Sequence, residues 1–155
     1  MSIQQCRLIF AETLRTLQVE EGDLGDDGMC QMRLKYDWMP ALNFCYIEHK
    51  DSLLLFAEAG YIDTDGELEV LKDLMHRQFL FNNSRGVTFS LADDSNAVTV
   101  QLMLDVSSLT VPILAEALQD FVEEVRHAVF RINDIPEDEY GANYGTTYTN
   151  SIIVG

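Results

Sequence analysis

Apolar and polar residues alternate along residues 29–36 and 42–48, and a third, mostly apolar stretch follows at 52–59. A period of two is typical of strands, because successive side chains of a strand point to opposite faces of its sheet. Pro40 separates the first two stretches, and the polar turn at 48–51 separates the last two. The pattern therefore predicts a meander of three antiparallel strands.

Residues 88–106 predict two further strands around the polar turn at 93–96. One face of this hairpin is apolar and contains Phe89, Leu91, Val98, Val100, Leu102 and Leu104. The other face contains Thr88, Ser90, Thr99, Gln101 and Met103, with no charged residue, in a chain that is 23% charged. Solvated strand faces are usually polar and charged, so we expect another part of the protein or a partner to cover this face.

Three segments repeat apolar residues at helical spacing. The first follows the capping-box pattern Ser2–Gln5 and continues to about Leu17, and the second follows Thr64–Glu67 and continues to about Asn82. The third begins near Pro112 and ends near Ile132. The order is helix, three strands, helix, two strands, helix. Short turns between neighbouring strands predict an α+β domain over residues 1–132, with an antiparallel sheet and three segregated helices.

The segment after this domain differs in composition. Residues 133–155 are rich in Gly, Thr, Asn and Tyr and have no helical period. We interpret them as a flexible polar tail, with a possible short strand at 148–154.

The charge balance excludes one class of partner. The chain has 155 residues, of which 26 are acidic and 10 basic, for a net charge of −16. Such a surface repels phosphate backbones, so nucleic-acid binding is not expected. No apolar stretch approaches the ~20 residues of a membrane span, and the N-terminus lacks a signal-peptide pattern. The three cysteines show no metal or redox spacing, so we expect a cytosolic protein with reduced thiols.

Residues with catalytic or metal-binding chemistry form no recognisable motif. The acidic loops around Gly28 and Gly66 do not match the ligand spacing of an EF-hand. The acidic pairs Asp93–Asp94 and Glu123–Glu124 are expected to be solvated. The three histidines are far apart in the sequence and are not beside a candidate nucleophile. We predict no catalytic residue, no metal and no cofactor, and an enzyme is the least favoured class.

Two surfaces are candidates for partner binding. Interface centres are depleted in charge and enriched in Met and aromatic residues, which fits the uncharged hairpin face. Either a second copy or another partner covers it, or the last helix or the tail covers it within one subunit. The second candidate surface combines the first helix, which has the extra apolar residues Leu8 and Ile9, with the meander. The minor face of the meander contains Met29, Cys45, Ile47, Leu54 and Phe56.

Over residues 1–132 the chain resembles the class I type III secretion chaperones, the Tir chaperone (CesT-like) family. The resemblance rests on the order of elements, the acidity and the segments SLLLFAEAG, ELEVLKDLMHRQFLFNN, GVTFSLADDSNAVTVQLMLDVSSLT and LAEALQDFVEEVRHAVF. It implies a homodimer in the bacterial cytoplasm without catalytic activity or membrane insertion. Such a dimer binds the N-terminal segment of a secreted effector in extended form and keeps it competent for export.

The resemblance also implies two sets of contact residues. Dimer contacts would fall on the second helix and late strands, at Leu71, Leu74, Met75, Thr99, Gln101 and Met103. Effector contacts would fall on the first helix and the meander, at Ile9, Leu17, Met32, Phe44, Tyr46 and Phe56. A one-residue error in strand register would exchange the two faces of the meander. The alternative function is an adaptor or regulatory module of the same fold without a role in secretion.

Overall fold

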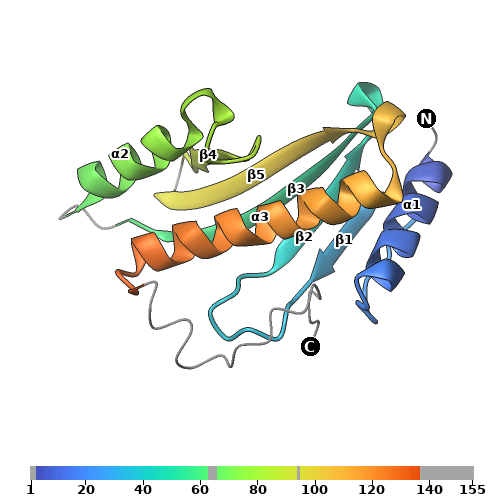
Figure 1. Ribbon diagram of the computed structural model, residues 1–155, viewed down its shortest axis with the longest axis horizontal. Helices are drawn as coiled ribbons and strands as arrows, with labels where there is room; N and C mark the ends of the chain where they lie inside the picture. The colour runs from blue at the N-terminus through green and yellow to red at the C-terminus, as the bar shows by residue number, and fades with distance from the viewer. Residues whose placement is uncertain (1–2, 63–65, 94, 137–155) are drawn as a thin grey trace.

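A five-stranded antiparallel sheet forms the centre of the protein (Figure 1). The computed structural model describes residues 3–62, 66–93 and 95–136. The strands are β1 (Met29–Met32), β2 (Leu42–Ile47), β3 (Ser52–Tyr61), β4 (Thr88–Leu91) and β5 (Ala97–Asp105). Their order in the sheet is β1-β2-β3-β5-β4, so β1 and β4 are the two edges. The predicted meander and hairpin are confirmed, and they join through the pairing of β3 with β5.

Three helices complete the fold. They are α1 (Ile3–Thr16), α2 (Glu67–Gln78) and α3 (Val111–Ile132). In Figure 1, α3 crosses the sheet, α1 lies at the β1 end, and α2 lies beside β4. The predicted order of elements and the α+β class are therefore confirmed. The α3 start also matches its sequence signal, since the Thr110 side chain accepts a hydrogen bond from the Ile113 N–H and Pro112 lies in the first turn.

The main core lies between α1, α3 and one face of the sheet, which we call the inner face. The Phe10 ring of α1 meets the Phe44 ring of β2 edge-on, with ring centroids 5.0 Å apart. From α3, apolar side chains three or four residues apart enter the same core: Leu114, Leu118, Phe121, Val125 and Ala128. This is the stripe that the helical spacing predicted.

The first strand is shorter than the sequence predicted, because β1 ends at Met32 rather than near residue 36. Beyond it the chain leaves the sheet, and Tyr36 stacks on Trp38 with ring centroids 5.4 Å apart. Trp38 in turn meets Phe130 of α3 edge-on at 5.3 Å. Aromatic packing against a distant helix thus ends the strand, although the alternation of apolar residues continues.

The second helix is also shorter than predicted and ends at Gln78 instead of near Asn82. Leu80 and Phe81 adopt positive φ angles of 53° and 56°, which end the regular helix. At this point the Gln78 side chain accepts a hydrogen bond of 2.8 Å from the Phe89 N–H of β4. The end of α2 is therefore tied to the edge of the sheet.

A buried ion pair fixes α2 against α3. Glu124 of α3 is only 1% exposed and accepts two hydrogen bonds from the Arg77 guanidinium. A buried carboxylate requires such a partner, because removal from water destabilises an unpaired charge. The pair orients a helix that buries only Val70 and Leu74 against the rest of the protein.

Several sequence-based predictions fall wholly or partly outside the described residues. These are the capping residues Ser2 and Thr64, Asp94 of the acidic pair, and residues 137–155 with the possible strand at 148–154. Of the predicted tail, the structure describes residues 133–136, where the Ile135 N–H donates to the Phe130 carbonyl at 2.9 Å.

Candidate functional site

The face of the sheet opposite α1 and α3, the outer face, carries a row of apolar side chains across four strands. Strand register aligns Met29 with Cys45, Cys45 with Leu54, and Leu54 with Met103. We call these four residues the outer row. Met29 and Met103, at its two ends, are each 49% exposed, and the two residues between them are partly exposed. Among the described residues, no helix lies over this row.

A second row on the outer face is mostly polar and contains no charged residue. It contains Gln31, Asn43, Phe56, Gln101 and Thr88. The Gln31 side chain donates to the Asn43 side chain at 2.8 Å, and the Thr88 hydroxyl donates to the Gln101 carbonyl at 3.4 Å. The nearest strand acids on this face are Glu58 and Asp105, one toward each end. An uncharged centre with charges at the rim is typical of a binding surface.

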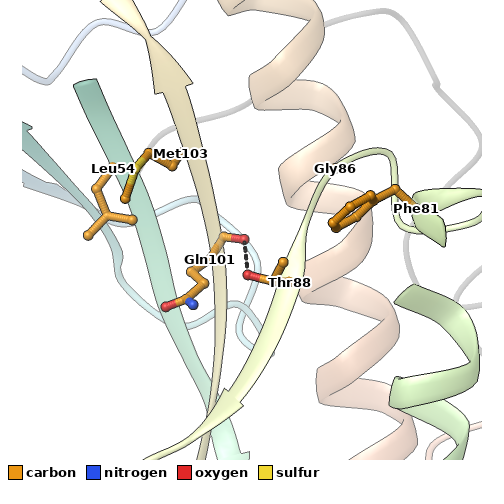
Figure 2. Close-up of a pocket in the computed structure, with 6 residues that line it drawn as sticks. All are labelled: Leu54, Phe81, Gly86, Thr88, Gln101 and Met103. Carbon is orange, nitrogen blue, oxygen red and sulfur yellow. Dashed lines mark hydrogen bonds between the residues drawn. The ribbon is translucent and has the colours of Figure 1, made fainter. Parts of the chain in front are cut away.

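A hollow marks the place where the outer face meets the end of α2. Figure 2 shows Leu54 and Met103 side by side on neighbouring strands, with Gln101 and Thr88 next to them. Phe81 and Gly86 complete the lining from the turn that precedes β4. The outer row therefore continues into the α2–β4 connection.

That connection exposes a run of large apolar residues. Phe79, Leu80 and Phe81 are 66%, 70% and 54% exposed, and Leu68 and Met75 of α2 are also exposed. The helical spacing predicts Phe79–Phe81 as part of the second helix, so the spacing does not indicate this exposed surface. The signal was three consecutive large apolar residues at a helix end, without a polar residue between them.

The residues predicted to bind an effector divide into two groups in the structure. Ile9 and Phe56 are partly exposed, and Phe56 lies on the outer face. Leu17, Met32, Phe44 and Tyr46 are buried in the core. The inner face of β1 and β2 holds the last three, because α1 packs there through contacts such as Phe10–Phe44. The exposed face of the meander is the one with Met29, Cys45, Leu54 and Phe56.

The residues predicted to form the dimer contact are mostly accessible. Met75 and Met103 are exposed, and Leu71, Thr99 and Gln101 are partly exposed. Leu74 is 2% exposed and packs in the core, since it is one of the two residues through which α2 is anchored. Thr99, Gln101 and Met103 all lie on the outer face, as the alternation along β5 predicted.

The described residues contain no cluster of three or more potential metal ligands. Burial raises the pKa of the Cys6 thiol to about 11, with a smaller contribution from the charge of Asp51, so this cysteine is protonated at neutral pH. Burial also raises the pKa of Cys30. Thiols are nucleophilic as thiolates, so neither residue is activated. The described helices include none that is both long and apolar enough to cross a membrane.

The chemistry of this site is therefore that of apolar contact and backbone hydrogen bonding on a sheet. In keeping with it, residues 9–128 match the model of the Tir chaperone protein (CesT) family. This match covers more than half of the chain, and the protein belongs to that family. The resemblance drawn from the sequence is confirmed. A search of curated proteins finds no significant match.

Solved structures with the same fold come from complexes of two proteins. The HopA1–SchA chaperone–effector complex contains a chain that is 20% identical, with a TM-score of 0.66 over 83% of this chain and 96% of that one. A chain in the ExsC–ExsE complex is 15% identical, with a TM-score of 0.64 over 83% and 94%. The Yersinia pestis type III secretion chaperone SycH, in complex with a stable fragment of YscM2, is 18% identical. Its TM-score is 0.59 over 79% of this chain and 98% of that one. At these identities the likeness concerns the fold.

Proposed function

We propose that this protein is a homodimeric chaperone in the bacterial cytoplasm that holds the N-terminal segment of a secreted type III effector in extended form. The single observation that carries the proposal is the uncovered, uncharged outer face. Within the described residues its apolar row is open, and exposed apolar patches of this kind mark binding sites. Membership of the Tir chaperone family and the partners named for the similar structures support the same conclusion.

The outer face divides into two halves in this proposal. The half formed by β5 and β4, together with α2 and Phe79–Phe81, contacts the sister subunit. It contains Met103, Gln101 and Thr99 on the sheet and Met75 on the helix. Met103 and Gln101 meet Phe81 at the hollow, so the sheet residues and the run after α2 form one continuous patch for a two-fold contact.

The other half, formed by β1–β3 and α1, contacts the effector. Met29, Cys45 and Phe56 provide apolar contact there, and Ile9 and the exposed Leu8 extend it onto α1. An extended segment gains main-chain hydrogen bonds at a sheet edge and specificity from side-chain contacts. Ordering that segment costs conformational entropy, so a large apolar area must offset the cost.

The two methionines at the ends of the outer row provide a matched test of this division. Met29 and Met103 are equally exposed in the protomer, so Met29→Asp and Met103→Asp perturb its fold to a similar degree. Each places a charge on an apolar contact, which disfavours burial of that contact. We expect Met29→Asp to lower effector capture roughly tenfold or more, equivalent to ~1.4 kcal/mol, while the dimer is retained.

The measurement is capture of secreted proteins from the source bacterium by the tagged full-length chain. The expected result is one or two dominant secreted proteins, bound through their N-terminal segments. Ser95→Asp, which adds the same charge in the exposed β4–β5 turn, is the control and should leave capture unchanged. Recovery of a kinase or transcription regulator instead of secreted proteins would favour the alternative, an adaptor of the same fold.

A further inference from the structure

The helix α2 has apolar residues on two different sides. Val70 and Leu74, four residues apart, are buried against the rest of the protein. On another side of the helix, Leu68 and Met75 are 65% and 58% exposed, and Leu71 between them is partly exposed. Spacings of three and four residues are typical of a helix seam that packs against a partner. Within the described part of the chain, this second set of residues is largely open.

Apolar burial alone determines the position of α2 weakly. Two buried side chains on a helix of 12 residues make a small contact, and apolar contact is not directional. A helix of this length has little stability of its own, so its place depends on what it packs against. Selecting one position of α2 along α3 therefore requires a more specific interaction.

Ion pairs in a defined order provide that interaction. Glu124 and Arg131 lie seven residues apart on one side of α3, and Asp73 and Arg77 lie four residues apart on α2. The Arg77 guanidinium donates to the Glu124 carboxylate, with one bond of 2.8 Å, and Arg131 donates to Asp73 at 2.6 Å. Each helix presents one acid and one base, in the order that an antiparallel contact requires.

This order of charges disfavours a helix that is shifted by one turn. A shift in one direction would bring Asp73 opposite Glu124, and a shift in the other would bring Arg77 towards Arg131. Either shift would place like charges together and separate Glu124 from its base. The cost would be large because Glu124 is 1% exposed. Buried polar pairs contribute little net stability, and the selection of register is their best-attested role.

We propose that Arg77 and Glu124 are positioning residues for self-association. They hold α2 in the one register in which its exposed side, the run Phe79–Phe81 and Met103 form a single surface for a second copy of the chain. Glu124 is buried within the protomer, so it acts on the dimer through the position of α2. The role in self-association rests on the homodimer proposed above, whereas the register of α2 does not.

The end of α2 provides a readout of register within one protomer. The Gln78 side chain accepts a hydrogen bond from the Phe89 N–H of the edge strand β4, so the Phe89 amide is protected while α2 is in place. Amide hydrogen exchange at Phe89 is measured in a Met103→Asp background, which is expected to be monomeric. No partner then contributes to the protection.

The test variant replaces the buried pair by apolar residues, Arg77→Met together with Glu124→Leu. Such a replacement is often neutral for stability, so we expect a urea midpoint that is not lowered. We expect exchange at Phe89 to be at least about tenfold faster, because the register is no longer selected. The control, Glu123→Leu with Arg126→Met, removes the same charges from an ion pair within α3 and should leave both values unchanged.

The effect on self-association is measured without the Met103 substitution. Light scattering over a dilution series gives the dissociation constant of the dimer. We expect this constant to rise at least about tenfold in the apolar variant, equivalent to ~1.4 kcal/mol, and to stay unchanged in the control.

Native-like exchange at Phe89 and a native-like dimer in the apolar variant would overturn the proposal. A lowered urea midpoint would also overturn it, because the pair would then serve the stability of the protomer rather than its register. Faster exchange with an unchanged dimer would overturn the role in self-association. A native chain that is monomeric at every concentration would contradict the proposed function together with that role, and exchange at Phe89 would still decide the register.

Discussion

The inner and outer faces of the sheet are both apolar, yet only one of them is covered by helices. On the inner face, Phe44, Leu55 and Val100 are fully buried beneath α1 and α3. On the outer face, Met29, Cys45, Leu54 and Met103 form a row that no described helix covers. An apolar face that the described part of the chain leaves open is typical of a surface that binds a partner.

The absence of charge makes the comparison informative. On the inner side, the buried Glu124 is tolerated because Arg77 pairs with it, and this ion pair holds α2 against α3. The rows at the centre of the outer face, Met29–Met103 and Gln31–Thr88, contain no charged side chain, although this face is open to water. Solubility alone does not require that, whereas burial in a complex does.

The largest contrast between the faces is expected in stability. Phe44→Ala removes a fully buried ring from the inner face and should lower the free energy of unfolding by about 3–5 kcal/mol. Phe56→Ala, on the outer face of the next strand, should cost about 1 kcal/mol or less, because its ring is already partly exposed. The free energy of unfolding is measured by urea denaturation of both variants in a Met103→Asp background. This background is expected to be monomeric, so dimer formation does not contribute to the measured stability. Equal losses would show that the outer face is packed within the protomer.

A smaller contrast is expected in the chemistry of the cysteines. Cys6 lies on the buried side of α1 and its pKa is raised to about 11, so only about one Cys6 thiol in a thousand is ionised at pH 8. Cys45, on the outer row, is partly exposed. Alkylation at pH 8, followed by mass spectrometry, should modify Cys45 well before Cys6 and should slow at Cys45 when a partner is bound. Alkylation of Cys6 first would contradict the assignment of the two faces.

The sequence was sufficient to predict the order of elements and the alternation within each strand, because both follow from local periodicity. The uncharged face of β5, with Thr99, Gln101 and Met103, was correctly separated from its buried face. In the meander, however, both faces are apolar. Alternation places Phe44 and Cys45 on opposite faces of the sheet, but it does not indicate which face is buried in the core. That choice depends on α1, whose Phe10 meets Phe44 from 34 residues away in the sequence.

Long-range contacts also explain the errors at element ends. The packing of Tyr36 on Trp38 and of Trp38 on Phe130 takes the chain away from β1, and no local pattern contains these contacts. The bond between Gln78 and Phe89 joins the end of α2 to a strand that follows it. Phe79–Phe81 are exposed as a result of this arrangement. Helical periodicity predicted instead that the helix continues through them. The position of β1 at the edge of the sheet likewise depends on strand order, which no local pattern contains.

The measurement that tests the account most directly is the mass in solution of three proteins by light scattering at moderate salt. We predict about twice 17.6 kDa for the native chain and for Met29→Asp, and about 17.6 kDa for Met103→Asp. A native chain that is monomeric at every concentration would contradict the claim that a second copy covers the β5 half of the outer face. A Met103→Asp variant that remains dimeric would place the dimer contact elsewhere.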